Sequence, residues 1–134
     1  MAGYSGTPLR RRLGIKEGHR VGLVRAPEAF GTALGDLPAG VRTTTTLGGQ
    51  LDVIVAFFAR RAELQRRFER LARVLERDGG LWIAWPKRTS GVETDLTEDV
   101  VREVALENGL VDNKVCAIDE TWSGPRLVYR LRDR

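Results

Sequence analysis

The 134-residue sequence has few of the side chains on which metal centres and nucleophilic enzymes depend. It contains one cysteine, Cys116, and one histidine, His19. A single cysteine excludes an internal disulfide and a multi-cysteine zinc site. We place His19 at the start of the first strand and Cys116 inside a strand at the opposite edge, too far for the contact of about 3 Å that a Cys–His nucleophilic pair needs. The composition therefore predicts no metal site. No bound cofactor is expected either, because the turn after the first strand, described below, does not suit one.

Long apolar runs are also absent. The longest, from Leu51 to Ala59, is interrupted by Asp52 and is less than half of the about 20 residues that cross a bilayer. Residues 1–13 carry arginines but lack the apolar stretch and cleavage site of a secretory signal. We therefore expect a cytoplasmic protein. A chain of this length is expected to form one domain, residues 1–134, with a tail and a short helix over 1–18.

The charge is positive but diluted. The 22 basic side chains exceed the 18 acidic ones by a formal charge of +4, while 42% of the residues are hydrophobic, as in packed globular proteins. Such a balance permits binding of nucleic acid or of an acidic ligand without requiring it, because clustering matters more than the sum.

Helix and strand signals alternate along the chain. Leu51–Phe58 is nearly all apolar, which is typical of a parallel strand covered on both faces. Arg60–Arg77 carries apolar residues at helical spacing along one stripe. Val41–Thr46 is β-branched at five of six positions but too polar for the middle of a sheet, and its position and direction are left open.

The full order of elements predicts the fold class. The first helix would be capped by Thr7 and the last would begin at Asp95 and Glu98 and end at Gly109. The expected strands are His19–Ala26, Val41–Thr46, Leu51–Phe58, Leu81–Trp85, Leu110–Ile118 and Arg126–Leu131, and the other helices are Pro27–Leu34 and Arg60–Arg77, the latter ended by Asp78, Gly79 and Gly80. This order indicates a three-layer, Rossmann-like α/β fold with a mostly parallel sheet and an antiparallel C-terminal hairpin.

Residues 51–131 resemble the second half of a class I S-adenosylmethionine-dependent methyltransferase. The resemblance rests on Asp52 opening an apolar strand, on the segment Leu75 to Leu81 between a helix and a strand, and on Gly109-Leu110 before a terminal hairpin. It implies a methyltransferase-like sheet in which the last strand runs antiparallel and lies next to Leu81–Trp85.

Four strings of sequence carry a second resemblance, which extends over the whole chain: Ala2 to Leu9, Leu81 to Lys87, Gly109 to Cys116 and Asp119 to Gly124. In these strings the chain is similar to a bacterial family, domain of unknown function 3052, and this resemblance has a limited content. It implies a fold and no particular chemistry.

Two departures from the methyltransferase pattern concern the cofactor. Those enzymes end their first strand in a glycine-rich turn that lets the backbone approach the cofactor. Here the turn runs from Arg25 to Gly31 and contains Pro27, which lacks a backbone donor, and Phe30, which is bulky. The second strand in those enzymes ends in an acid that binds the ribose hydroxyls, whereas here it ends in threonines. A further departure concerns topology, because the link from Thr46 to Leu51 is too short for the helix, strand and second helix that those enzymes insert there.

Ligands of open α/β sheets bind outside the carboxyl ends of the strands, so we expect a site there. Cations and hydroxyls suited to a phosphate or carboxylate would lie beside planar indole rings, with two longer loops as neighbours. The candidate ligand-binding residues are Arg25, Arg60, Trp85, Lys87, Arg88, Ser90, Asp119, Glu120, Trp122 and Ser123. The alternative is that the cations are solvated or paired and that the tryptophans belong to the core.

Three functions remain open from the sequence. The first is a non-catalytic binding or interaction module of methyltransferase-like fold that recognises a small anionic ligand or a protein partner. The second is a minimal S-adenosylmethionine-dependent methyltransferase with an atypical pocket. The third is a nucleic-acid-binding protein, in which tail arginines join a predicted arginine face on the last strand, formed by Arg126, Arg130, Arg132 and Arg134. Asp119 and Glu120 are not expected to form a catalytic pair, because adjacent residues on an extended segment point to opposite sides.

Overall fold

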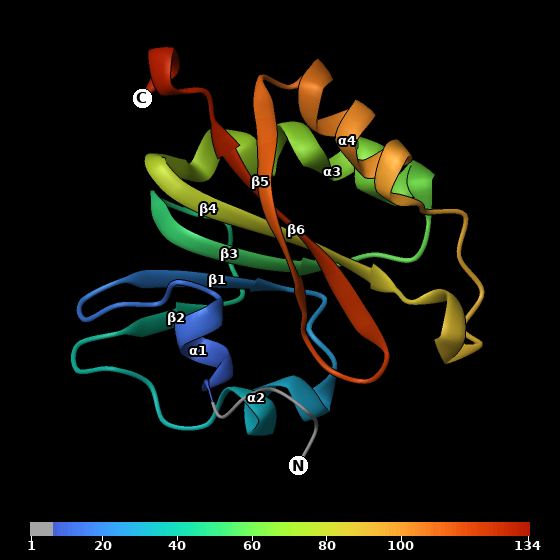
Figure 1. The fold of residues 1–134 in the computed structure, drawn as a ribbon. Coiled ribbons are helices and arrows are strands. Elements are labelled where there is room, and N and C mark those ends of the chain that lie inside the picture. The colour runs from blue at the N-terminus through green and yellow to red at the C-terminus, as the bar shows by residue number, and fades with distance from the viewer. Residues whose placement is uncertain (1–6) are drawn as a thin grey trace.

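The computed structural model describes residues 7–134, which form one six-stranded sheet flanked by helices (Figure 1). The strand order is β2-β1-β3-β4-β6-β5, and β6 is antiparallel to both of its neighbours. The elements are α1 (Leu9–Arg12), β1 (Arg20–Val24), α2 (Glu28–Leu34), β2 (Arg42–Thr44), β3 (Leu51–Phe57), α3 (Arg61–Val74), β4 (Leu75–Pro86), η1 (Arg88–Ser90), α4 (Glu98–Glu107), β5 (Leu110–Ala117), β6 (Trp122–Tyr129) and η2 (Leu131–Asp133).

Two apolar clusters, one on each face of the sheet, confirm the predicted three layers. Alternation along β3 sends Ile54 to the cluster beneath α3 and α4, and Val53 and Val55 to the cluster beneath α1 and α2. Both faces are therefore buried at this strand, which explains its nearly continuous apolar sequence. None of the helices in residues 7–134 has the length and apolar character needed to cross a bilayer.

The second strand is short and lies at the edge of the sheet, parallel to β1. β2 spans only Arg42–Thr44, and the chain then returns to β3 through residues 45–50. This link is shorter than a usual parallel crossover, which needs a dozen or more residues. Leu47 in this link is buried in the cluster beneath α3. No helix covers the link, as its length predicts.

The boundary between α3 and β4 differs from the prediction. The helix ends at Val74, and residues 78–80, expected to end it, lie inside β4. Leu75 pairs with Leu51, and the register then shifts so that Gly80 pairs with Val53. A Cβ on Gly79 would lie 2.6 Å from the carbonyl oxygen of Asp52, so glycine is required there by the approach of two strands and not by a helix end.

The C-terminal hairpin is longer and tighter than predicted. β6 begins at Trp122, so residues 122–125, expected in a loop, belong to the strand. Gly124 lies against the carbonyl of Ile83, leaving no space for a side chain. The strand ends at Tyr129, and β5 is the edge of the sheet. The predicted arginine face is therefore wrong, since only Arg126 lies in the strand and the other three follow it.

Two predicted helix caps are also wrong. Pro8, not Thr7, is the N-cap of α1. α4 is capped by Thr97, whose hydroxyl accepts the N–H of Val100 at 3.2 Å. Asp95 serves a different helix, because its carboxylate accepts the N–H of Arg61 at the start of α3 at 2.7 Å. The start of α3 is therefore capped by a residue of the segment that leads into α4.

Candidate functional site

The strand order reverses between β1 and β3, and in an open α/β sheet the crevice outside the carboxyl ends at this point is the usual ligand site. Here aromatic rings fill it. Phe30 from α2 and Phe57 from the end of β3 meet edge to face with centroids 5.0 Å apart, and Phe57 meets Trp122 at 5.3 Å. Phe30 and Phe57 are only 1% and 2% exposed. The switch-point crevice is closed on this face of the sheet.

Arg25 lies at the opposite face of the same crevice, against α3. Its guanidinium lies 2.6 Å from the carboxylate of Glu63 on α3 and 5.8 Å from the ring centroid of Phe58. Arg25 has a φ of 57°, and among residues 7–134 it is the one residue other than glycine with a positive φ. Residues other than glycine adopt this backbone conformation at a cost in free energy. The contacts of Arg25 with α3 offset that cost and hold the turn in place.

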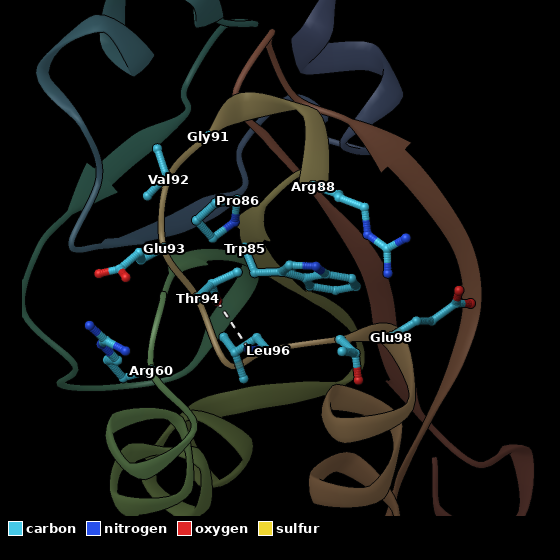
Figure 2. Close-up of a pocket in the computed structure, with 11 residues that line it drawn as sticks. Arg60, Trp85, Pro86, Arg88, Gly91, Val92, Glu93, Thr94, Leu96 and Glu98 are labelled. Atoms are coloured by element: carbon cyan, nitrogen blue, oxygen red, sulfur yellow. Dashed lines mark hydrogen bonds between the residues drawn. The ribbon is translucent and has the colours of Figure 1, made fainter.

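A cavity of about 640 Å³ lies one strand away on the same edge, between the end of β4, the loop that follows it and the start of α4 (Figure 2). Trp85 is half-buried against the core and presents its indole ring to this pocket. Leu96 and Pro86 add apolar surface. We call it the Trp85 pocket. Its lining residues are Arg60, Trp85, Pro86, Arg88, Gly91, Val92, Glu93, Thr94, Leu96, Thr97 and Glu98.

Charged groups stand on two sides of the indole ring. Figure 2 shows Arg60 and Glu93 on one side and Arg88 and Glu98 on the other. Glu98 is occupied, since it accepts from Arg102 at 2.9 Å. Within residues 7–134, Arg60 and Arg88 make no ion pair and no side-chain hydrogen bond. Two guanidinium groups are thus available to a ligand, opposed by one uncompensated carboxylate, that of Glu93.

The pocket wall is fixed by the hydrogen bonds of its threonines. The hydroxyl of Thr94 donates to the carbonyl of Ala59 at 2.6 Å and accepts the N–H of Leu96. Thr97 is occupied as the cap of α4. The hydroxyl of Thr94 holds the loop against the segment that follows β3. Both hydroxyls are engaged, so the polar groups left for a ligand are chiefly the arginines.

The structure brings three of the ten predicted site residues, Arg60, Trp85 and Arg88, into the Trp85 pocket. The two predicted loops are neighbours, because the N–H of Lys87 donates to the carbonyl of Thr121 at 2.7 Å. Ser90 has a structural role instead. Its hydroxyl donates to the carbonyl of Lys87 at 2.7 Å and accepts the N–H of Val92.

The predicted residues of the hairpin serve its turn. Asp119 accepts the N–H groups of Thr121 and Trp122, both at 2.8 Å. Trp122 and Ser123 lie on β6, not in a loop, and Trp122 packs on Phe57. Glu120 is exposed in the turn. Together with Arg25, which is paired with Glu63, these residues lie outside the Trp85 pocket.

Sequence reasoning missed the far wall of the pocket, formed by Val92 to Glu98. A signal was available. In a strand-loop-helix unit of a parallel sheet, the loop and the first turn of the helix lie at the carboxyl edge, so the whole segment from Lys87 to Glu98 could have been assigned to the site.

His19 and Cys116 do not line the Trp85 pocket, and each is hydrogen-bonded to a neighbouring part of the chain. The Nδ1 of His19 accepts the backbone N–H of Lys16 at 3.1 Å. Cys116 is buried, and burial raises the pKa of its thiol against the opposing effect of Arg12 and Lys114. Within residues 7–134, no cluster of three or more metal-binding side chains is present.

The strand order, the antiparallel β6 between β4 and β5, and helices on both faces define the fold of class I S-adenosylmethionine-dependent methyltransferases. A structure of magnesium protoporphyrin IX methyltransferase from Synechocystis with bound S-adenosylmethionine is similar, with a TM-score of 0.58 and 12% identity over 91% of this chain and 74% of that one.

Two further structures have the same architecture. An S-adenosylmethionine-dependent methyltransferase from Aquifex aeolicus matches with a TM-score of 0.59 and 16% identity over 87% of this chain and 85% of that one. A protein from Sulfolobus solfataricus, described provisionally as a type 11 methyltransferase, matches with a TM-score of 0.65 and 14% identity over 91% and 89%. At these identities the similarity establishes the fold alone.

No family model and no curated protein matches the sequence. Membership of the domain of unknown function 3052 family therefore stays a prediction.

Proposed function

We propose that this protein is a binding module of methyltransferase-like fold that holds a small, planar, anionic molecule in the Trp85 pocket. The observation that carries the proposal is the pair of guanidinium groups without carboxylate partners, Arg60 and Arg88, on either side of the half-buried indole ring of Trp85. Guanidinium groups form charge-assisted hydrogen bonds with carboxylates and phosphates, and the indole ring offers a stacking surface.

The size and setting of the pocket support the proposal. Its volume of about 640 Å³ falls within the range of roughly 300 to 1,000 Å³ that small-molecule sites occupy. The carboxyl edge of the sheet is where ligands of open α/β folds bind. Because Glu98 is paired with Arg102, the uncompensated charge around the ring favours an anion over a cation.

The state of the switch-point crevice supports a non-catalytic role. A cofactor placed outside β1 and β3 would have to displace the rings of Phe30 and Phe57, which are almost fully buried. The competing function, an S-adenosylmethionine-dependent methyltransferase, is favoured by the fold of its structural neighbours. Binding of the cofactor distinguishes the two.

The test is a titration monitored by the indole N–H resonances of the three tryptophans, with Trp85→Phe used to assign the signal of Trp85. The probes are inorganic phosphate, benzoate, adenosine monophosphate and S-adenosylmethionine. We expect adenosine monophosphate, which is both planar and anionic, to shift the Trp85 signal in a saturable way and more tightly than phosphate or benzoate.

Charge-matched variants supply the control. Arg60→Gln and Arg88→Gln should each weaken binding by about tenfold, because a charge-assisted hydrogen bond contributes more than 1 kcal/mol. Arg66→Gln changes the same charge at an exposed position on α3 and should leave binding unchanged. No shift of Trp85 with any probe, or equal weakening by Arg66→Gln, would exclude the proposed site.

A further inference from the structure

A second polar cavity, of about 420 Å³, lies at the opposite end of the sheet, where β1, β3 and the register shift of β4 begin. We call it the amino-end pocket. Four cations line it, Arg11, Lys16, Lys114 and Arg126, together with His19 and the carboxylates of Asp52 and Asp78. With neutral histidine its lining carries two more positive than negative charges. The residues come from α1, β3, β4, β5, β6 and the segment before β1, so only the fold assembles them.

Arg126 is one of the cations that line this cavity. Arg126 lies on β6, the strand between β4 and β5, and is half-buried. Within residues 7–134 it has no ion pair and no hydrogen bond from its guanidinium. Burial, and then the nearby Arg134, lower the pKa of Arg126. A partly desolvated cation beside another cation is unfavourable unless an anion compensates it.

Gly80 makes space for this guanidinium. A Cβ at Gly80 would meet the Nε of Arg126 and would lie 2.9 Å from its Cζ. The guanidinium therefore lies flat against the backbone of β4. The two glycines of the register shift have separate roles, since Gly79 admits the neighbouring strand and Gly80 admits Arg126.

The other polar groups complete a set of donors. Because the Nδ1 of His19 accepts a backbone N–H, neutral His19 carries its proton on Nε2 and is a donor to the cavity. Lys114 lies opposite Arg126 in the β5–β6 ladder. Asp52 is already engaged, since its carboxylate accepts the N–H of Arg20 at 2.8 Å. The cations thus outnumber the carboxylates left to pair with them.

We propose that the amino-end pocket binds the phosphoryl group of a small molecule, with Arg126 as its principal contact. This site is independent of the Trp85 pocket, which lies at the other end of the strands. A phosphoryl group suits it because several cations converge from different elements, so an anion with three or more acceptor oxygens can contact them together.

Pyrophosphate is the probe, and calorimetry with thermal unfolding is the readout. We expect saturable binding that weakens as salt is added, and a higher midpoint of unfolding with the ligand. Arg126→Gln should weaken binding by about tenfold or more. The same variant should raise the unfolding midpoint of the free protein, because it removes an uncompensated, partly buried cation. A merely structural arginine would give a lower midpoint.

Two further variants separate geometry from charge. Gly80→Ala keeps every charge but displaces the guanidinium, and it should weaken pyrophosphate binding as well. Arg66→Gln changes the net charge by the same amount as Arg126→Gln, on the far face, and should not weaken it. Arg60→Gln alters only the Trp85 pocket, so its effect on the earlier titration and its lack of effect here distinguish the two sites.

A short single-stranded DNA forms the second arm, because its phosphodiester groups share the same chemistry. Binding of pyrophosphate that depends on Arg126, with DNA binding unaffected by Arg126→Gln, supports the proposal. Binding of DNA through Arg126 without binding of pyrophosphate would overturn it in favour of a nucleic-acid surface. The absence of pyrophosphate binding, or binding by the Arg126→Gln and Gly80→Ala variants as tight as by the natural protein, would also overturn it.

Discussion

The crevice outside β1 and β3 and the pocket outside β4 lie on the same edge of one sheet, yet they differ in almost every respect. The crevice is filled by Phe30 and Phe57, and its polar group, Arg25, is paired with Glu63. The Trp85 pocket is open, and its arginines have no carboxylate partner. Strand order therefore marks where a ligand can bind, whereas the side chains at each strand end decide whether space is left for it.

Removal of the central ring of the crevice should give the largest effect. Phe57→Ala deletes a side chain that is 2% exposed and contacts two other rings, so we expect it to lower the free energy of unfolding by about 3 to 5 kcal/mol. Urea unfolding followed by circular dichroism measures this. Trp85→Ala removes a half-buried ring and should cost less than half as much. Equal losses at the two positions would remove the contrast between a filled and an open site.

The turn after β1 provides a smaller test of the same closure. Arg25→Gly and Arg25→Ala both lose the ion pair with Glu63, which is exposed enough to contribute little. They differ in backbone freedom, because φ at this position is 57°. The glycine variant should be more stable than the alanine variant by about 1 kcal/mol in the same urea experiment. An alanine variant as stable as the glycine one would mean that the turn is not held in a strained conformation.

The smallest expected effect concerns Cys116, which belongs to the same buried cluster as Phe57. Because burial raises the pKa of the thiol, less thiolate is present in the folded state, and iodoacetamide should alkylate it more slowly than in the unfolded chain. Phe57→Ala should accelerate the reaction if it loosens this cluster.

The raised pKa of the Cys116 thiol also predicts how the free energy of unfolding changes with pH. The unfolded thiol has an ordinary pKa of 9.0, and the folded thiol titrates at higher pH. The contribution of Cys116 to stability is therefore constant below pH 9.0 and declines as the pH rises above it. The free energy of unfolding should fall more steeply in this range for the natural protein than for Cys116→Ala. Identical slopes would contradict a raised pKa.

Much of the fold was predictable because its signals are local and periodic. The apolar run of β3, the stripe of α3 and the final hairpin all gave elements of the right type, and together they indicated the three-layer sheet. The errors occurred where a long-range contact overrides a local signal. Gly79 and Gly80 resemble a helix end, but the pairing of Leu75 with Leu51 extends β4 through them.

The candidate site was predictable in position and incomplete in composition. The rule that ligands bind at carboxyl ends placed Arg60, Trp85 and Arg88 at one edge, and the structure brings these three into one pocket. It could not exclude Asp119 or Trp122, because their roles in a tight turn and in a ring cluster depend on where β6 begins. The amino-end pocket had no local signal at all, since its cations lie far apart in the sequence.

The closure of the switch-point crevice is tested most directly by adding S-adenosylmethionine and following the indole N–H of Trp122, whose ring packs on Phe57 at the crevice. We predict that the Trp122 resonance does not move at any concentration of the cofactor, while Trp85 retains its response to adenosine monophosphate. A saturable shift of Trp122, with matching shifts of the backbone amides of Arg25 and Ala26, would show that the crevice opens for the cofactor and would contradict the account.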